Sequence, residues 1–451
     1  MLRVAAVDLG ATSARVAVVS FHDDGPPTID VVHRYPHQPV VHGDGTLRWN
    51  WAALMAEVEL GLEGALAGGP LASIGVDTWG VDYGLLDEQG ALIAPPFSYR
   101  DARTDGWRAT VDRLGEQRLY ASTGVQLMPI NTVFQLAVHP RAELARAAAL
   151  LMLPELVVHH LTGAITAEIT SAATTGLVSL ATDTWDDALL DDIGVSSSLF
   201  RPIAPSGTRV GDWRGVPVHL VGGHDTASAV RTRQGRRGLR SAFVSTGTWV
   251  LVGVESDAPI TSEAARAANF SNERSVDGRY RVLKNVTGLW LLERCRVAWG
   301  DPPISALVEA AAAAPVPPLV NPDDVRFAHA GDMAAEIAAA TGLSRDDWGG
   351  ITRCVIESVA GRVAAVVGEV GAVTGTPVDE LDVFGGAIQI EPLMQALRHA
   401  TGLPILIGVA EATALGNASE QFDALSGRRV AGSGVLHSGT LTGIAHRGEP
   451  A

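Results

Sequence analysis

The chain has 451 residues, of which 47% are hydrophobic and 19% charged, and its formal net charge is -16. This length exceeds one ordinary hydrophobic core, so two domains are predicted. The acidic balance argues against a general attraction to nucleic acid or to anionic lipid, and we expect a small-molecule substrate instead. Anionic ligands stay possible, because backbone N–H groups at turns and helix ends can hold phosphate locally.

The two cysteines, Cys295 and Cys354, show no CxxC spacing and no clustering with histidine, so we interpret both as core thiols. The N-terminus lacks a basic stretch followed by a long apolar run, and no segment of about eighteen uncharged apolar residues occurs. We therefore expect a cytoplasmic protein without a membrane partner, either a monomer or a homodimer.

The opening of the chain predicts a strand, a tight turn and a second strand. The apolar run from Val4 to Asp8 leads into a turn at Gly10–Ser13, and Ala14 to Ser20 resumes the run. A helix is predicted over Trp51–Leu66, because its apolar residues recur at helical spacing. Further strands are predicted at Leu71–Val76, Val81–Leu86 and Val216–Val221. This alternation of strands with helices is typical of an α/β fold.

A polar, basic and glycine-containing stretch at Arg233–Gly238 predicts an exposed connection. We place the domain boundary there, giving domains 1–236 and 237–451. Directly afterwards, Ala242–Ser245 and Trp249–Val254 flank a Thr-Gly-Thr turn and repeat the arrangement of the N-terminus. The repeat is compatible with a duplicated unit and equally with two unrelated hairpins.

The second half of the chain predicts another strand-to-helix junction. A long helix is expected over Ile351–Val373, and a strand at Leu381–Phe384 runs into Gly385-Gly386-Ala387. A helix over Pro392–Thr401 and a buried strand over Ile405–Val409 follow. Glycine at such a junction suits close approach of a ligand.

Phosphoryl transfer needs charge stabilisation on the phosphates, a divalent metal, and a carboxylate that orients and deprotonates the attacking hydroxyl. Small residues at Gly10, Thr12 and Ser13 leave backbone N–H groups approachable, and Arg15 adds a positive charge, although such a turn is also compatible with a purely structural role. Asp8 would hold Mg²⁺ through its waters, or would merely stabilise the turn.

Asp225 follows an apolar strand in the segment Gly222–Ser228 and opens an Ala-containing helix. Sites in α/β proteins lie at this carboxyl end of strands, but N-capping of the helix explains an aspartate there equally well. The sequence has no GxxxxGK[ST], GxGxxG, GxSxG or HExxH segment. The ordinary nucleotide folds, the serine hydrolases and the zinc enzymes therefore lack their motifs.

Four segments together resemble the FGGY carbohydrate kinases of the actin-like ATPase superfamily. These segments are Asp8–Ser13, Ser245–Trp249, Gly385–Ala387 and Glu411–Asn417, and the resemblance runs from Val4 to Asn417. It implies a two-domain α/β fold of actin-like ATPase (ribonuclease H-like) type with the active site in the cleft between the domains. The N-terminal domain would bind the sugar, and the C-terminal domain the nucleotide.

Four further stretches are most similar to the subfamily that phosphorylates L-rhamnulose: Val76–Gly84, Tyr99–Thr104, Thr123–Gln126 with Asn131–Thr132, and Leu283–Trp290. The resemblance implies transfer of the γ-phosphoryl group of ATP to the C1 hydroxyl of L-rhamnulose, giving L-rhamnulose 1-phosphate and ADP, with Mg²⁺ as cofactor. Alternatives are a kinase for another ketose or polyol, such as L-fuculose or xylulose, and a non-catalytic nucleotide-binding regulator on the same fold.

The resemblance also assigns roles to individual residues. Asp225 would be the catalytic base. The sugar would be lined by Asp225 together with Gly80, His224, Thr226 and Asn285, and the nucleotide by Thr12, Ser13, Arg15, Thr248 and Gly386. Two departures from the family pattern, Ala387 in place of a third glycine and Glu293 in place of a more usual glutamine, leave the nucleotide contacts there open.

Overall fold

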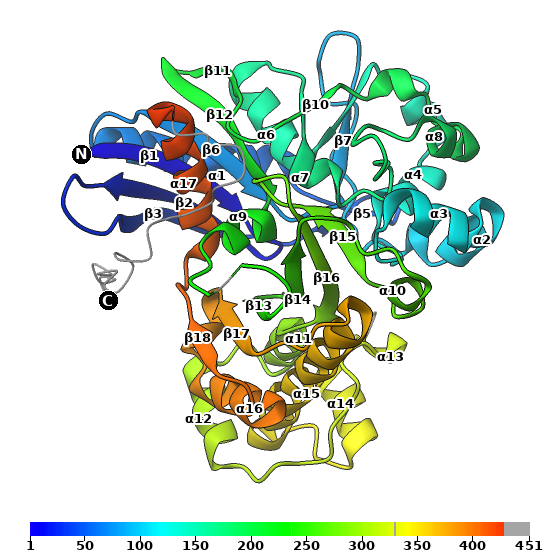
Figure 1. Ribbon diagram of the computed structural model, residues 1–451, viewed down its shortest axis with the longest axis vertical. Helices are drawn as coiled ribbons and strands as arrows, with labels where there is room; N and C mark the ends of the chain where they lie inside the picture. Colours follow the sequence, from blue (N-terminus) through cyan, green and yellow to red (C-terminus); the bar gives the residue numbers. More distant parts are fainter. Residues whose placement is uncertain (236, 329–330, 428–451) are drawn as a thin grey trace. The chain divides into compact units, whose positions relative to one another are not determined.

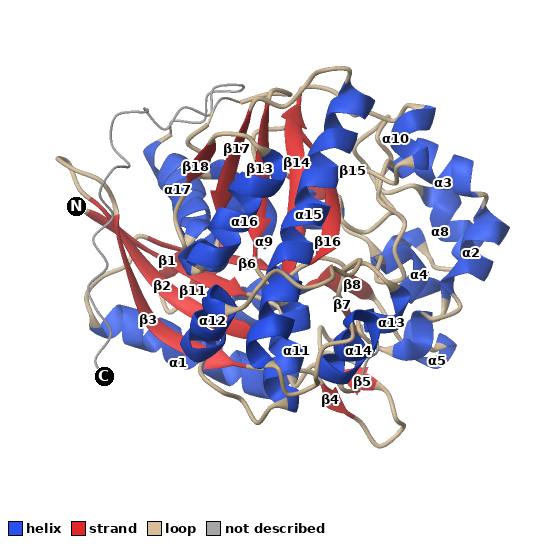
Figure 2. Ribbon diagram, turned by 90° about the horizontal axis from the view of Figure 1, so that it is seen from below, coloured by secondary structure: helices blue, strands red, loops and turns tan. Residues whose placement is uncertain are grey.

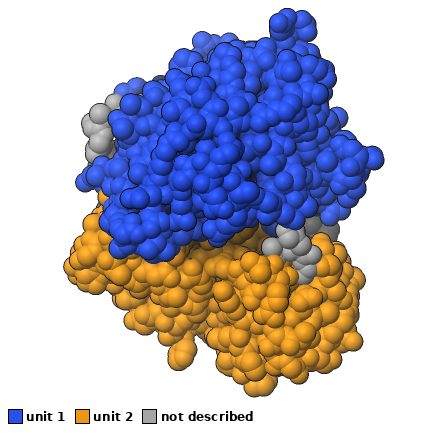
Figure 3. Space-filling model, turned by 90° about the vertical axis from the view of Figure 1, so that its right-hand side faces the viewer, with its two compact units in different colours: residues 1–232, 257–281, 411–451 blue, residues 233–256, 282–410 orange. Residues whose placement is uncertain are grey.

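A computed structural model describes residues 1–235, 237–328 and 331–427 of the chain, which form two compact units, coloured separately in Figure 3. Unit 1 consists of Met1–Thr232, Asp257–Arg281 and the chain from Glu411 onward, and unit 2 of Arg233–Ser256 and Val282–Ala410. The predicted boundary at residue 236 lies outside the described residues, and the predicted ranges 1–236 and 237–451 stay a prediction.

Unit 1 is built on a six-stranded sheet in the order β11-β12-β6-β1-β2-β3 (Figure 1). Its strands are β1 (Leu2–Leu9), β2 (Ser13–Phe21), β3 (Thr28–Pro36), β6 (Ser73–Thr78), β11 (Arg209–Trp213) and β12 (Val216–His224). Strand β1 is antiparallel to β2 and parallel to β6, which is parallel to β12. The predicted apolar run is fully buried from Val4 to Val7, and the strand–turn–strand prediction for the N-terminus is confirmed.

Two helices far apart in the sequence pack against this sheet. Helix α1 (Trp51–Ala67), as predicted, contacts β2 and β3, whereas α17 (Ala412–Ser426) contacts β1, β6 and β12. The last described helix of the chain therefore packs on the sheet to which the first strand belongs.

A second apolar core of unit 1 lies around the two-stranded antiparallel sheet of β7 and β8 and a group of short helices, which are drawn in blue at the right of Figure 2. Buried Leu119, Phe134, Leu136 and Leu190 belong to it. The remaining elements of unit 1 are β4 (Val40–Val41), β5 (Leu47–Arg48), β7 (Tyr83–Leu86), β8 (Ala149–Met152), β9 (Ala167–Glu168), β10 (Ile203–Ala204), β15 (Ser271–Arg274), α2 (Trp107–Leu114), α3 (Glu116–Thr123), α4 (Thr132–Ala137), α5 (Arg141–Leu144), α6 (Leu153–Thr162), α7 (Ile169–Ala172), α8 (Asp187–Ile193), α9 (Asp225–Arg231) and α10 (Glu263–Ala267).

A second six-stranded sheet has the order β15-β16-β14-β13-β17-β18. Its other strands and the helices of unit 2 are β13 (Ser241–Thr246), β14 (Trp249–Ser256), β16 (Tyr280–Thr287), β17 (Glu380–Phe384), β18 (Ile405–Ile407), α11 (Trp290–Ala298), α12 (Ile304–Ala313), α13 (Val325–Ala328), α14 (Met333–Thr341), α15 (Trp348–Thr374) and α16 (Glu391–Thr401). The predicted hairpin β13–β14 and the predicted helices α15 and α16 are confirmed. Both cysteines are buried and free, as interpreted.

The two sheets repeat one arrangement of strands. In each, an antiparallel hairpin, β1–β2 or β13–β14, pairs through its first strand with a parallel strand, β6 or β17, and this strand pairs with a further parallel one. This repetition favours a duplicated unit over two unrelated hairpins. Among the helices of the described ranges, none combines the length and the apolar character needed to cross a membrane.

Two local predictions were wrong. Strand β18 is not buried: Leu406 and Ile407 are 36% and 45% exposed, because the strand lies at the edge of its sheet. Residues 233–235, 237 and 238 of this stretch lie in neither a helix nor a strand, as predicted, but the Arg233 side chain is buried rather than exposed. It donates to Glu255 and to the carbonyl oxygen of Ser241, both at 2.8 Å, and such pairing makes burial of a charge possible.

We expect the substitution Gly416→Ala to destabilise unit 1, because Gly416 of α17 lies directly against Ser228 of α9. A Cβ atom at this position would lie 1.7 Å from the Ser228 carbonyl oxygen. Backbone atoms must move to admit it, which costs about 3 kcal/mol and lowers the melting temperature by several degrees. Thermal denaturation followed by circular dichroism measures this change.

Gly361→Ala is the matched control, since Gly361 also lies within a helix, but a Cβ atom there would meet no neighbouring atom within 4 Å. Alanine favours helix there by about 1 kcal/mol, so this variant should melt at or above the wild-type temperature. Equal melting of the two variants would contradict the close approach of α9 and α17.

Candidate active site

Asp225 stands where β12 leaves the sheet and α9 begins. The parallel pairing of β12 with β6 is regular from Val218 to Leu220, is interrupted after Leu220, and resumes only at His224. Side chains replace the missing ladder bonds: the Gly223 N–H donates to Glu168 Oε2 at 3.1 Å, and the His224 N–H donates to Thr170 Oγ1 at 3.2 Å. Side chains therefore hold the interrupted stretch of β12, and pairing with β6 holds its last residue.

Glu168 and Glu155 form the buried support of this strand end. Glu168 also accepts hydrogen bonds from Thr170 and from the hydroxyl of Ser206, and its own N–H donates to Glu155 Oε1 at 2.8 Å. Burial raises the pKa of both carboxyl groups, that of Glu155 to about 7. Within the described residues, the buried Glu155 Oε2 has no hydrogen-bond partner.

The Asp225 side chain is 30% exposed, and its Oδ1 accepts hydrogen bonds from the Thr226 N–H at 2.5 Å and the Thr226 hydroxyl at 3.1 Å. Asp225 is the first residue of α9, and the N-cap position is occupied by His224, which makes no side-chain cap bond. Asp225 Oδ1 thus accepts an N–H of the first turn of α9 without being its N-cap residue, and the catalytic role of Asp225 stays a prediction.

Two further carboxylates lie on the neighbouring parallel strands. Asp8 near the end of β1 pairs in register with Asp77 of β6, and both side chains are buried. Burial raises the pKa of Asp8, and burial together with the charge of Asp8 holds the pKa of Asp77 well above its usual range; the nearby charge of Asp225 acts in the same direction on both. Three acidic groups thus gather where three parallel strands end.

Cationic and amide groups offset part of this negative charge. Arg15 Nε donates to Asp8 Oδ2 at 2.7 Å, and its Nη1 lies 2.9 Å from Glu411 Oε2. Asn417 Nδ2 of α17 donates to Asp77 Oδ2 at 2.6 Å. Asp77, Glu411 and Asn417 were not predicted to lie near Asp8. For Asp77, the carboxyl edge that β6 shares with β1 was the signal that could have indicated it.

Thr12 lies in the turn between β1 and β2, and Ser13 is the first residue of β2; the Gly10 N–H donates to the carbonyl oxygen of Ser13 at 3.1 Å. His37 holds this turn, since its N–H donates to Thr12 O at 3.0 Å and its ring Nε2 lies 2.8 Å from Gly10 O. Burial lowers the pKa of His37 to about 4, so the ring is neutral near pH 7 and Nε2 donates. The role of His37 was also missed.

Gly80 follows β6 and precedes a strained residue. Val81 has a φ of 72°, in the left-handed region that a β-branched residue avoids, so the strand predicted from Val81 begins only at Tyr83. Its N–H donates to Thr174 Oγ1 at 3.3 Å, and its carbonyl oxygen accepts from Thr132 Oγ1 at 2.7 Å. Strain held in place by surrounding side chains is characteristic of functional sites.

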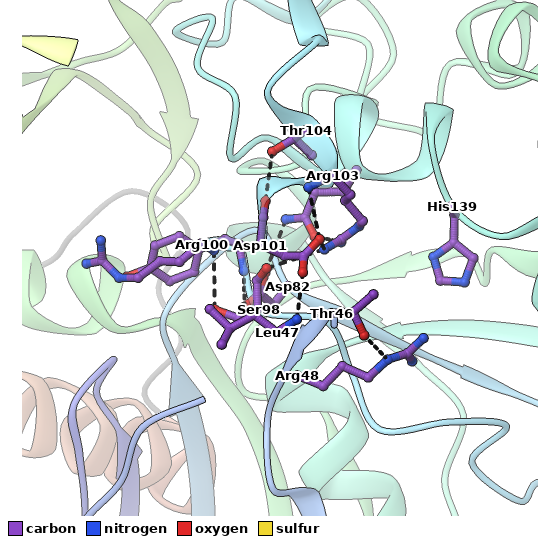
Figure 4. A network of polar contacts seen from close by, with 12 residues as sticks. Thr46, Leu47, Arg48, Asp82, Ser98, Arg100, Asp101, Arg103, Thr104 and His139 are labelled. Carbon is purple, nitrogen blue, oxygen red and sulfur yellow. Dashed lines mark hydrogen bonds and ion pairs between the residues drawn. The ribbon is translucent and has the colours of Figure 1, made fainter. Parts of the chain in front are cut away.

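Buried Asp82 fixes the residue before Gly80. Its Oδ2 accepts from the indole N–H groups of Trp49 at 2.8 Å and Trp79 at 3.0 Å, and its Oδ1 accepts from Gln135 Nε2 at 3.1 Å. Figure 4 shows Asp82 beside Asp101 and Arg103. Arg103 Nη2 in turn donates to Gln135 Oε1 at 2.6 Å. Burial raises the pKa of Asp82 to about 6. Trp79 and the Gly80 turn are therefore positioned by a buried polar network.

His224 lies between two carboxylates. Its Nε2 is 3.4 Å from Asp225 Oδ1, and its Nδ1 is 3.3 Å from Glu273 Oε2, on strand β15. Arg281, at the start of β16 and fully buried, places Nη2 3.3 Å from the same Glu273 oxygen. Neither Glu273 nor Arg281 was singled out by the sequence analysis.

In unit 2, the predicted nucleotide-side residues come together. Thr248 lies in the β13–β14 turn, and Gly386 opens a 3₁₀ turn after β17. The Thr246 hydroxyl donates to Phe384 O at 2.7 Å, and a Cβ at Gly385, whose φ is 96°, would lie 2.4 Å from Thr246 O. The two glycine-containing turns are thus packed directly against each other.

Two further residues of unit 2, Asn285 and Glu293, were considered for contacts with a ligand and lie in consecutive elements. Asn285 is in β16, and Glu293 is in α11, where its carboxylate is 2.9 Å from Arg296 Nη2. Glu293 is therefore a paired carboxylate. The roles of all these residues toward a ligand stay predictions. Within the part of the chain that the structure describes, no set of three or more His, Cys, Asp or Glu side chains is arranged to hold a metal ion.

Comparison with known protein families gives this arrangement a class. Residues 3–228 match the N-terminal domain of the FGGY family of carbohydrate kinases, and residues 242–424 match its C-terminal domain. The chain belongs to the FGGY family of carbohydrate kinases.

Two curated relatives refine the comparison. The chain is 41% identical over 440 residues to the rhamnulokinase of Pectobacterium carotovorum subsp. carotovorum, covering 94% of this chain and 88% of the relative. It is 38% identical over 432 residues to the rhamnulokinase of Bacteroides thetaiotaomicron, covering 91% and 88%. The predicted resemblance to this group of kinases is confirmed.

Solved structures of sugar and polyol kinases share the fold. A gluconate kinase from Lactobacillus acidophilus gives a TM-score of 0.75 at 16% identity, covering 95% of this chain and 90% of that one. The glycerol kinase of Plasmodium falciparum gives 0.71 at 15% identity, covering 94% and 90%. The predicted two-domain α/β fold of actin-like ATPase type is confirmed, and a cleft as the place of the active site stays a prediction.

Glu155 should make folding stability depend on pH. In the unfolded chain its carboxyl group ionises near 4.5, but in the folded chain burial moves the pKa to about 7. The unfolded state therefore loses this proton first, and the contribution to stability falls as the pH rises from about 4.5 to about 7, remaining level above.

Glu155→Gln has no proton to lose, so its stability relative to the wild type should improve across this window by up to about 3 kcal/mol. Urea denaturation of both proteins at pH 5 and pH 8 measures the difference. A difference in unfolding free energy that is the same at both pH values would contradict the raised pKa.

Proposed function

We propose that this chain is an ATP-dependent kinase that transfers the γ-phosphoryl group of ATP to the C1 hydroxyl of L-rhamnulose, giving L-rhamnulose 1-phosphate and ADP. The observation that carries the proposal is the position of Asp225, a partly exposed carboxylate at the carboxyl end of β12, in a chain about 40% identical to curated rhamnulokinases over more than nine-tenths of its length. As predicted, the enzyme would work in the cytoplasm.

Asp225 would act as the base. A carboxylate that orients the attacking hydroxyl and accepts its proton commonly contributes two to four decades in rate. One of its oxygens is fixed by Thr226, and the side chain is still partly exposed, so a sugar hydroxyl can reach it. Gly80, His224 and Thr226 of unit 1, together with Asn285 of unit 2, would line the sugar.

The nucleotide would be bound through backbone N–H groups of the glycine-containing turns. Thr12 and Ser13 with Arg15 would face it from unit 1, and Thr248 and Gly386 from unit 2. Both turns of unit 2 leave room for a ligand: a Cβ at Gly247 would meet only Trp249 O, at 3.7 Å, and one at Gly386 would meet nothing within 4 Å. Gly247 and Gly386, unlike Gly385, are therefore not required by the packing of the turns and would leave space for an approaching ligand.

The residues around Asp8 suit a divalent cation held through water. Burial and the negative charge of Asp225 raise the pKa of Asp8 and of Asp77, and Asp77 Oδ1 is a buried oxygen without a hydrogen-bond partner among the described residues. When bound there, Mg²⁺ would neutralise charge on the β- and γ-phosphates. Arg15 holds Asp8 in place through its Nε, which donates to Asp8 Oδ2.

The choice of sugar is the direct test of this function. A site that pairs each hydroxyl leaves its own polar groups unsatisfied with an epimer, at a cost of roughly 1–3 kcal/mol per lost partner. We therefore expect kcat/KM for L-rhamnulose to exceed that for L-fuculose and D-xylulose by about ten- to a hundredfold. A coupled assay of ADP release across ketoses and polyols measures it.

The outcomes separate the alternatives. Equal or better turnover of L-fuculose or D-xylulose would overturn the assignment of the sugar and leave a carbohydrate kinase. If none of the compounds causes release of ADP, a non-catalytic nucleotide-binding protein on the same fold is favoured.

Replacing the proposed base tests the mechanism. Asp225→Asn keeps the size of the side chain but removes the proton acceptor, so kcat should fall by about a hundredfold or more while ATP still binds. Steady-state kinetics and a nucleotide-induced thermal shift measure the two effects. Asp212→Asn, which removes an exposed carboxylate from neighbouring β11, is the control and should turn over normally. Turnover near the wild-type rate in Asp225→Asn would exclude Asp225 as the base.

A further inference from the structure

Two carbonyl groups of the β13–β14 turn are held by the start of α11. The Leu289 N–H donates to the carbonyl oxygen of Gly247 at 3.1 Å, and the Trp290 N–H donates to that of Thr248 at 3.2 Å. Leu289 is the N-cap of α11, and Trp290 is its first residue. The first N–H groups of a helix lack acceptors within the helix, so the turn supplies acceptors for two of them.

These hydrogen bonds determine the direction of the Thr248 N–H. The Gly247 carbonyl and the Thr248 N–H belong to one planar peptide group, and in a trans peptide they point to opposite sides. The described residues contain no cis peptide bond. Because the Gly247 carbonyl points toward α11, the Thr248 N–H points away from it. Thr248 is partly exposed, and among the described residues its N–H has no hydrogen-bond partner.

Gly288 is the residue that allows this contact. A Cβ atom there would lie 2.9 Å from each of three backbone atoms, namely the carbonyl oxygens of Gly247 and Thr248 and the carbonyl carbon of Trp249. The φ of Gly288 lies outside the left-handed region, so glycine is needed here for space and not for backbone conformation. A side chain at position 288 would therefore push the turn away from α11.

Asp323 holds the residue before Gly288. Its Oδ1 accepts a hydrogen bond from the Thr287 N–H at 2.9 Å, and its Oδ2 accepts one from Arg362 Nε of α15 at 2.8 Å. Thr287 is the last residue of β16. Arg362 thus orients the carboxylate that fixes the end of β16 and, with it, the position of Gly288.

We propose that residues 288–290, held by Asp323, form a clamp that directs the Thr248 N–H toward a phosphate group of the nucleotide. Gly288 and Asp323 are positioning residues, since they act through the turn and touch no ligand. A turn free to rotate its peptide groups would also present carbonyl oxygens, which repel phosphate; the clamp keeps these oxygens on the side of α11. The inference rests on the proposed function and deepens it, because it names the donor of the β13–β14 turn and the residues that orient it.

The affinity for ATP in the absence of sugar is the first test. In Gly288→Ala the added methyl group separates the turn from α11, so the Kd for ATP should rise by about tenfold or more, as expected for loss of a hydrogen bond to a charged group. Under turnover, KM for ATP should rise in parallel, while KM for the sugar stays within about twofold of the wild type. Isothermal titration calorimetry measures the Kd. An unaltered Kd overturns the proposal.

Gly349→Ala is the matched control. A Cβ atom at Gly349 of α15 would lie 2.8 Å from the carbonyl oxygen of Ala310 in α12, an approach to backbone like that at Gly288. Neither helix carries a residue assigned to a ligand. Both variants should melt below the wild type, but only Gly288→Ala should lose affinity for ATP. An equal loss in Gly349→Ala overturns the proposal, because general destabilisation of unit 2 would then explain both.

Asp323 provides a milder second test, since its side chain is 29% exposed and it lies in neither a helix nor a strand. Asp323→Ala removes the acceptor of the Thr287 N–H, and the Kd for ATP should rise by about three- to tenfold. Asp323→Asn keeps an acceptor oxygen and should bind ATP within about twofold of the wild type. An unaltered Kd in Asp323→Ala, or an equal rise in Asp323→Asn, contradicts the clamp.

The Thr248 N–H can also be observed directly. In protein labelled with ¹⁵N-threonine, the Thr248 amide signal, identified by its absence in Thr248→Ser, should move downfield when ATP is added, because the N–H then donates to phosphate. In Gly288→Ala this movement should be lost. A Thr248 signal that does not move in a wild type that binds ATP overturns the proposal. A wild type that shows the movement but phosphorylates no sugar supports the clamp and refutes the proposed function.

Discussion

Three carboxylates at the ends of three adjacent parallel strands are the constraint on which unit 1 depends. Asp8 on β1 and Asp77 on β6 lie close enough to Asp225, after β12, for its negative charge to oppose their ionisation, and the charge of Asp8 opposes that of Asp77. Parallel pairing puts these chain positions at one edge of the sheet, whatever their separation in sequence. Such a group persists only where cations and hydrogen-bond donors compensate it, and Arg15 and Asn417 do so here.

The same compensation of buried charge shapes the surroundings of the site. Glu168 accepts a hydrogen bond from the Gly223 N–H where the pairing of β12 with β6 is interrupted. Asp82 accepts hydrogen bonds from the indole N–H groups of Trp49 and Trp79. In each case a desolvated carboxylate is stabilised by several donors and in return fixes the backbone or ring that supplies them. The groups assigned to the sugar therefore rest on rigid polar contacts and not on loop geometry alone.

Local sequence patterns predicted a large part of this fold. The run Val4–Asp8, the turn after it, helix α1 and the hairpin β13–β14 all follow from short-range periodicity and turn residues. The position of Asp225 at a strand end was predicted in the same way. Patterns of this kind record which residues are apolar and where a turn is favourable, and those properties are local.

What escaped prediction depends on contacts distant in sequence. No pattern around Asp77 indicates its bond to Asn417, and nothing around Val81 indicates the left-handed backbone that Thr132 and Thr174 hold. Arg233 was expected at the surface because its buried partner Glu255 cannot be seen from charge alone. Glu273 and Arg281 escaped for a similar reason: an isolated acid and an isolated base in strands reveal no chemistry until the fold places them beside His224.

Helix α17 also gives the chain an order of events during synthesis. Asp77 and the Asn417 amide that holds it are separated by 340 residues, so at ordinary translation rates the ribosome works for roughly 20 to 70 seconds between making the one and the other. The rest of the unit 1 sheet and all of unit 2 are made within that interval, while the sheet of unit 1 lacks the helix that packs against β1, β6 and β12. During synthesis the sheet of unit 1 therefore stays without α17 until unit 2 has been made. Unit 1 begins first and is completed last.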